Sequence, residues 1–221
     1  MKFILAIAII ISSFVFAAAQ NEQAPIVEKD IAYKDWVYKN VQTGTDMNLR
    51  KFTFGKKLVM VVYFAPWCGN WKHDLPFVQK MYEKYKNNGF DVIAVGEYDP
   101  VDSMKAHIGQ YKLTFPVVWE SDARTAKQTT SHFEYRRSVG DTRNWGSPWY
   151  VFLEVNKLES AGLIMTKRAP VVSGELIRID AEKFIREKLG LSPDGAAEIS
   201  KAGEIEICEP EKKTTALVKP D

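Results

Sequence analysis

The sequence predicts a single α/β domain with a mixed central β-sheet flanked by helices. Two continuous runs of β-favouring apolar residues, KKLVMVVYFA and FDVIAVGE, are typical of strands that are buried on both faces. A helical pattern separates them, and the order strand–helix–strand implies parallel neighbours joined by a right-handed crossover. Later, SPWYVFLE and AGLIMTK lie close enough together to form an antiparallel pair.

Composition limits the classes of function. With 221 residues, 46% of them hydrophobic and 26% charged, the chain fits one globular domain with ends to spare. Thirty basic residues against 28 acidic ones leave a formal charge of +2. This balance gives no electrostatic footprint for nucleic acid, and we expect no nucleic-acid partner.

The first residues predict export. Lys2 precedes an uncharged apolar run, and Ala17 and Ala19 form an A-x-A cleavage pattern before Gln20. We therefore expect a signal peptide over residues 1–19, a secreted or periplasmic protein, and no membrane attachment after cleavage. The alternative is a retained anchor, for which the apolar run is short.

The remaining elements follow in order. We expect a flexible polar leader over residues 20–30 and a folded domain over residues 31–190. The domain should begin with an N-terminal hairpin around QTGTD at a sheet edge and end with a helix over DAEKFIREKLG. Between them, the segment after FAPWCG and VDSMKAHIGQY have helical periodicity, and FPVVWES is strand-like. Residues 191–221 have the composition of a flexible tail.

The stretch FAPWCGNWKHDLP carries the candidate chemistry. Its cysteine, Cys68, lies between a buried strand and the first turn of a helix. Unpaired N–H groups and the helix dipole at that position favour a thiolate, which is a nucleophile. The alternative is a buried, inert cysteine. The chain has one other cysteine, Cys208, in the tail.

APWCGNWK resembles the thioredoxin active-site signature, matching at Trp67, Cys68, Gly69 and Lys72. The order of elements over roughly residues 30–190 is similar to the exported TlpA/ResA-type branch of that fold, which is related to the AhpC/TSA redoxins. The resemblance implies a thioredoxin-like three-layer sandwich. One position departs from it, because Trp71 stands where the family has its second cysteine.

The resemblance also implies roles for other residues. Ser147-Pro148 matches the cis-proline that faces the active-site cysteine and shapes a substrate groove. Glu97, in AVGEYD, matches the acid that ResA-like proteins keep beside their thiols and would handle a proton. Apart from the resemblance, Trp67, Trp71, Trp145 and Trp149 could supply the aromatic floor of a groove that holds an extended peptide, and Trp71 would shield the sulfur.

A single thiol leaves three functions open, because the second step of a dithiol cycle needs a second nucleophile. Cys208 could be the resolving thiol. Cys68 could instead form a mixed disulfide or a sulfenic acid that an external reductant or thiol resolves. Peroxidase activity is disfavoured, since Ala65 replaces the threonine of peroxiredoxins. The third function is a redox-inactive module that binds peptides or proteins. We expect a monomer whose partners are protein or small-molecule thiols and disulfides.

The segment before Ser147-Pro148 is a candidate for the rim of the substrate groove. Arg136, Arg137, Arg143 and Trp145 mix cations with aromatic rings, which suits an anionic or peptide partner. The alternative is a packed extra helix with solvated arginines.

No cofactor is predicted. The three histidines, His73, His107 and His132, lack the spacing of metal ligands, so we expect no metal site. Phosphate-loop, dinucleotide and serine-elbow motifs are not found.

Overall fold

The computed structural model describes residues 22–193. The predicted signal peptide (1–19), Cys208 and nearly all of the predicted tail therefore lie outside the described residues. Within residues 22–193, none of the helices combines the length and the apolar character needed to cross a bilayer.

Eight strands form the main sheet, in the order β2-β9-β8-β5-β6-β7-β3-β4, and β1 pairs with β10 in a small separate sheet. The strand bounds are β1 Gln23–Ala24, β2 Val27–Lys34, β3 Val37–Asn40, β4 Asp46–Asn48, β5 Leu58–Phe64, β6 Phe90–Gly96, β7 Val117–Trp119, β8 Trp149–Glu154, β9 Ile164–Val172 and β10 Glu175–Leu176.

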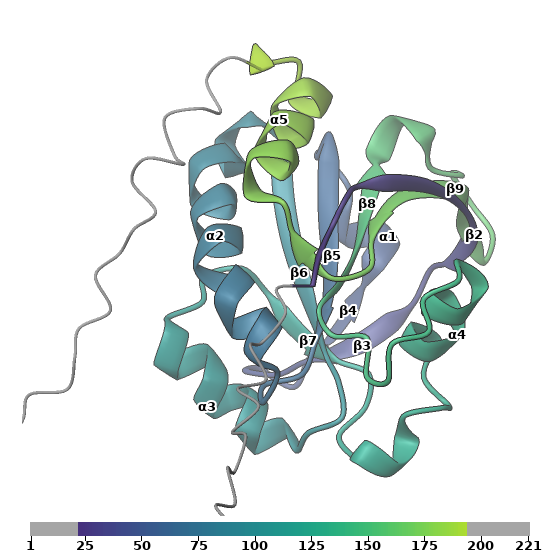
Figure 1. The fold of residues 1–221 in the computed structure, drawn as a ribbon. Coiled ribbons are helices and arrows are strands. Elements are labelled where there is room, and N and C mark those ends of the chain that lie inside the picture. Colours follow the sequence, from purple (N-terminus) through teal and green to yellow (C-terminus); the bar gives the residue numbers. More distant parts are fainter. Residues whose placement is uncertain (1–21, 194–221) are drawn as a thin grey trace, which may run out of the picture.

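Helices cover both faces of the sheet, as Figure 1 shows. The α-helices are α1 Leu49–Phe52, α2 Gly69–Tyr85, α3 Val101–Tyr111, α4 Ser131–Ser138 and α5 Arg178–Leu189, and 3₁₀ turns occupy Lys86–Asn88, Arg124–Ala126 and Val155–Lys157. Residues of α2, α3 and α5 share one core cluster, whereas α1 and α4 contribute to the other. The predicted three-layer sandwich is confirmed.

The central strand β5 shows why the sequence forms these layers. All seven of its residues are buried. Because successive side chains of a strand point to opposite faces, Leu58 and Met60 pack under α2 and α5, while Val59 and Val61 pack toward α1 and α4. A strand buried on both faces needs the continuous apolar run that the sequence contains.

The pairing of the strands is mixed, as predicted. β5 runs parallel to β6, and β6 runs parallel to β7, while β8 and β9 pair antiparallel. The predicted N-terminal hairpin is β3 and β4, which pair antiparallel at one edge of the sheet. With this pairing, the C-terminal ends of β5 and β6 and the N-terminal end of β8 lie side by side at one end of the strands. Cys68 follows β5 there.

The prediction of a flexible leader over residues 20–30 is wrong for its described part. β1 pairs with β10, and β2 pairs with β9 from Val27 to Lys34. This pairing could not be predicted from the polar composition of QNEQ and VEKD. β2 is an edge strand, and it is stabilised by main-chain hydrogen bonds and by the buried side chains of Ile31 and Tyr33.

Replacing a leucine of β5 tests the central role of this strand. We expect Leu58→Ala to lower the free energy of unfolding by about 3 kcal/mol, because Leu58 is fully buried and its loss leaves a cavity. The matched control is Leu163→Ala, since Leu163 is 63% exposed and should change stability by about 0.5 kcal/mol or less. Urea denaturation of both variants measures the difference, and equal losses would contradict this assignment of the core.

Candidate functional site

Cys68 lies at the start of α2, as the sequence predicts. It is the N-cap residue of the helix and is partly buried, and its thiol is free. Its main chain is fixed on both sides, since its N–H donates to the Ala65 carbonyl at 2.9 Å and its carbonyl accepts from Lys72 N–H at 3.1 Å. The sulfur is thereby held where the strand meets the helix.

The Ser147–Pro148 loop lies directly against this sulfur. Its peptide bond is cis. The Cys68 thiol lies 3.2 Å from the Ser147 carbonyl and donates to it, and Ser147 Oγ accepts from Ala65 N–H at 3.0 Å. The residue before the proline therefore contacts both the sulfur and the residue that follows β5, which is the arrangement that the resemblance implies.

Trp71 does not line an open groove, which corrects the prediction. It is fully buried, its ring centroid lies 5.1 Å from that of Phe64, and its Nε1–H donates to His107 Nε2 at 2.9 Å. Burial, followed by the nearby charge of Lys72, lowers the pKa of His107 to about 4. A neutral imidazole is thus available to accept the indole hydrogen bond, and the position of the family's second cysteine is filled by core packing.

The prediction that Arg136 lies on the rim of the groove is also wrong, because this residue has no exposed surface. From α4 it reaches under the proline loop, where its Nη1 lies 3.5 Å from Asp141 Oδ2 and donates to the Arg143 carbonyl at 3.2 Å. A Cβ built on Gly146 would lie 2.0 Å from that same Nη1. Only glycine lets the guanidinium pack this closely behind Ser147.

Arg143 holds the same loop from the other side. Its Nη2 donates to the Pro148 carbonyl at 3.1 Å and to Asp141 Oδ2 at 2.8 Å. Burial by itself would raise the pKa of Asp141, but the hydrogen bonds and charge of Arg143 lower it below its usual value. Asp141 is therefore an anion shared by two arginines, and these residues position the loop.

The rim beside Cys68 consists of other cations than those predicted. The rings of Trp67 and Trp145 meet edge to face, with centroids 5.2 Å apart. Arg124 lies 4.9 Å from the Trp67 ring and Lys127 lies 4.7 Å from the Trp145 ring. We call these four residues the tryptophan rim; the exposed Arg137 instead contacts Phe133.

Glu97 is buried in a separate polar cluster. Burial raises its pKa well above the usual value, and the neighbouring Glu120 raises it further while Arg136 opposes the shift. Glu120 in turn accepts from the main-chain N–H groups of Ser131 and His132 at the start of α4. The two side chains that shift the pKa of the Glu97 carboxyl group, Glu120 and Arg136, therefore connect it to α4.

Sequence reasoning missed Asp74 and Tyr150. Asp74 is fully buried, and burial raises its pKa to about 6. Tyr150 donates to Asp74 Oδ2 at 2.7 Å, and burial, Asp74, Glu175 and Cys68, in that order, raise the pKa of Tyr150. The signal was present, since Asp74 interrupts the apolar stripe of α2 formed by Trp71, Leu75 and Val78.

Comparison with known proteins establishes the class. The fold is that of a thioredoxin-like protein, and Cys68 is the one cysteine among residues 22–193. Solved structures with this fold include a secreted thiol-disulfide isomerase from Corynebacterium glutamicum, with a TM-score of 0.51, 16% identity and coverage of 76% of this chain and 86% of that one. Another is a thiol:disulfide interchange protein of the thioredoxin family from Chlorobium tepidum, with a TM-score of 0.50, 15% identity and coverage of 73% and 98%.

The chain belongs to the AhpC/TSA family, whose model matches residues 27–140. The thiol-disulfide oxidoreductase ResA of Oceanobacillus iheyensis is 29% identical over 112 residues, covering 49% of this chain and 58% of that protein. The chain thus spans less than two thirds of the length of this relative. A "Probable phospholipid hydroperoxide glutathione peroxidase" of Mesembryanthemum crystallinum is 25% identical over 161 residues, covering 68% of this chain and 91% of that protein.

The contact between Gly146 and Arg136 gives a matched pair of variants. Both Gly146 and Gly140 have positive φ, at 63° and 88°, but no atom lies within 4 Å of a Cβ built on Gly140. Alanine should cost about 1–2 kcal/mol at either position through backbone strain. Gly146→Ala should cost about 1–3 kcal/mol more, because it displaces Arg136. Urea denaturation gives both values, and equal costs would exclude the proposed packing.

The lowered pKa of His107 predicts that the free energy of unfolding depends on pH. Its folded-state pKa is about 4 and its ordinary value is 6.5, so the unfolded chain binds more protons between these values. The stability that depends on neutral His107 is fully present above pH 6.5 and is lost as the pH falls toward 4. The stability advantage of wild type over His107→Gln should therefore shrink over this range in urea titrations. If the difference in stability between wild type and His107→Gln does not change with pH, the assignment of a neutral His107 in the folded protein is wrong.

Proposed function

We propose that the protein is an exported thiol-disulfide oxidoreductase that works with one active-site cysteine. The observation that carries this proposal is the placement of Cys68, whose free thiol lies at the start of α2 and contacts the carbonyl of Ser147 beside a cis-proline. The A-x-A pattern before Gln20 and the similarity to ResA support export and the reaction class.

The reaction is a single thiol-disulfide exchange. The Cys68 thiol loses its proton to solvent, and the thiolate attacks one sulfur of a substrate disulfide. A Cys68–substrate disulfide forms, the substrate S–S bond breaks, and the departing thiolate takes up a proton. Because the side chains that shift the pKa of Glu97 are Glu120 and Arg136 and not Cys68, we assign these proton transfers to water at the partly exposed Cys68.

The resolving thiol must come from outside the folded site. Trp71 occupies the position of the second cysteine, and Cys68 is the one cysteine among residues 22–193. Cys208 of the same chain is the first candidate, since a tethered thiol has a high effective concentration if its linker can span the distance. A small thiol or a partner protein is the second.

The tryptophan rim favours a partner with carboxylates or a polypeptide main chain. Arg124 is exposed and Lys127 partly so, and each lies over an indole beside the Cys68 motif. A cation held in this way still presents N–H donors to an incoming anion. We expect protein or small-molecule thiols and disulfides with anionic groups to be bound best.

A second candidate is peroxide reduction, which the similarity to the glutathione peroxidase of Mesembryanthemum crystallinum favours. The Cys68 thiolate would then attack the peroxide, becoming a sulfenic acid and releasing an alcohol or water. Ala65 offers no hydroxyl for orienting a peroxide, and its N–H already donates to Ser147 Oγ.

Peptide mapping under non-reducing conditions distinguishes these functions. We expect mild oxidation of the mature protein with a disulfide such as oxidised glutathione to modify Cys68. In wild type, a Cys68–Cys208 link should replace the adduct if Cys208 resolves it, and the adduct should persist in Cys208→Ser. Mass spectrometry of the peptides measures both species.

Cys68→Ser is the control, and it should lose every adduct at this position. A stable adduct in both wild type and Cys208→Ser would assign resolution to an external thiol. A sulfenic acid that forms with peroxide faster than the adduct forms with disulfide would favour the second candidate. If Cys68 stays unmodified with either oxidant, the redox function is wrong and a peptide-binding module takes its place.

A further inference from the structure

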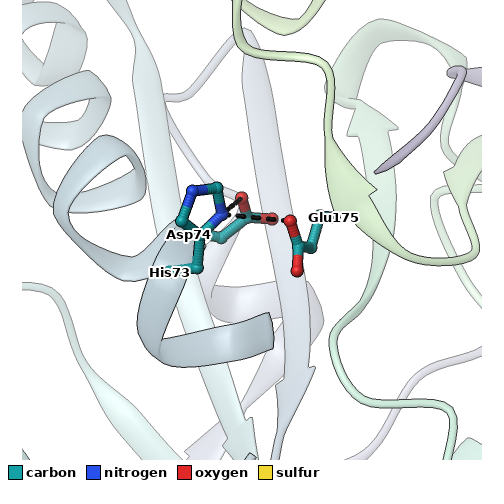
Figure 2. Close-up of side chains that lie close together, drawn as sticks. All are labelled: His73, Asp74 and Glu175. Atoms are coloured by element: carbon teal, nitrogen blue, oxygen red, sulfur yellow. Dashed lines mark ion pairs between the residues drawn. The ribbon is translucent and has the colours of Figure 1, made fainter. Parts of the chain in front are cut away.

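Three potential metal ligands converge near the start of α2. Figure 2 shows His73 and Asp74, from the first turns of α2, pointing toward Glu175 of β10. His73 Nδ1 lies 3.0 Å from Glu175 Oε2 and 3.9 Å from Asp74 Oδ1. One ligand atom from each residue lies within 4.8 Å of the other two.

The two carboxylates are buried without enough donors. Asp74 has no exposed surface and Glu175 is 2% exposed. Among residues 22–193, no donor forms a hydrogen bond with Asp74 Oδ1 or a well-aligned one with Glu175 Oε2. A buried carboxylate oxygen without a hydrogen-bond donor is costly, and the only ion-pair contact that these two oxygens make within residues 22–193 is the one to His73 Nδ1.

The surrounding structure fixes the ligand atoms. Tyr150 O–H and Leu176 N–H donate to the other oxygen of Asp74, at 2.7 and 2.8 Å, and so orient Oδ1. Glu175 is held through its main chain, because its N–H donates to the Glu22 carbonyl at 2.9 Å where β10 pairs with β1. Partners of this kind, which orient the ligands themselves, are typical of metal sites.

We propose that His73, Asp74 and Glu175 form a site for a divalent transition-metal ion of the zinc type. The ion would bind to Nδ1, Oδ1 and Oε2, and water would complete its coordination. Three ligands at about 2.1 Å from a tetrahedral ion lie about 3.4 Å apart, so the observed separations require only small side-chain movements. The imidazole favours Zn²⁺ over Mg²⁺ and Ca²⁺, which prefer oxygen ligands alone.

Charge and access agree with this occupant. Two carboxylates and a neutral imidazole carry a charge of −2, which a divalent ion balances. His73 has a side chain that is 44% exposed, and this gives the ion an entry path. Arg178 Nη2 lies 3.1 Å from His73 Nε2 and donates to the His73 carbonyl at 3.1 Å. Metal on Nδ1 places a proton on Nε2, so Arg178 would keep only its bond to the carbonyl.

The sequence alone could not show this site. His73 and Asp74 are adjacent, but Glu175 comes from β10, about a hundred residues later in the chain. The site does not depend on thiol chemistry at Cys68, so it can be tested in a protein without cysteines.

Zinc binding is measured on the mature Cys68→Ser/Cys208→Ser protein, by competition with a chromophoric zinc chelator, because thiolates would otherwise bind zinc themselves. We expect one Zn²⁺ per chain. His73→Ala and Glu175→Gln should each weaken binding by at least about 100-fold, and Tyr150→Phe by about 10-fold, because it frees the orientation of Asp74. Asp102→Asn removes a carboxylate that is 92% exposed, and it should leave binding unchanged.

Thermal unfolding separates loss of binding from loss of folding. Zn²⁺ should raise the Tm of the parent protein and leave that of a folded His73→Ala variant unchanged. Anomalous scattering from a zinc-loaded crystal should place the ion between His73 Nδ1 and Glu175 Oε2. The proposal is overturned if the parent protein does not bind Zn²⁺, or if His73→Ala and Glu175→Gln bind it as tightly as the parent.

Discussion

The site depends on the two hydrogen bonds of Ser147. Its hydroxyl accepts from the N–H that follows β5, and its carbonyl accepts from the Cys68 thiol. These bonds join the end of the central strand, the start of α2 and the loop that leads into β8. The sulfur, the strand and the proline loop are therefore joined by hydrogen bonds, which would preorganise the site for the proposed reaction of two sulfurs.

Buried charge supports this unit from behind. Arg136 is removed from water, and Asp141 and the carbonyl of Arg143, both of which contact its Nη1, offset part of the desolvation cost. Because Gly146 has no side chain, the guanidinium can pack against the main chain just before Ser147. The segment that the sequence presents as a candidate binding rim is for this reason mainly a support for the loop.

Trp71 changes the chemistry without disturbing the fold. The indole fills the space under Phe64, and its buried N–H is paired because it donates to His107. In the proposed function, the site keeps the first nucleophile of a thioredoxin-like protein, Cys68, and has Trp71 in place of the second. A mixed disulfide formed there would last until another thiol reaches it, which suits capture and transfer more than rapid local turnover.

The sequence by itself determined the layers and the position of Cys68. Continuous apolar runs identified β5 and β6, periodicity identified α2 and α3, and the Trp-Cys-Gly motif placed Cys68 at a helix start. These are local patterns, because each depends on residues close together in the chain. The tertiary structure alone decided that β2 is ordered, since β9 supplies its hydrogen bonds.

Tertiary structure also decided which polar residues are buried. Arg136 and Arg137 are neighbours of the same type, yet the first is inside the protein and the second is exposed. His73 and Glu175 meet only because β10 returns to the start of α2. Burial and contact between distant segments are set by the whole fold, and they cannot be predicted from the spacing of residues within one segment.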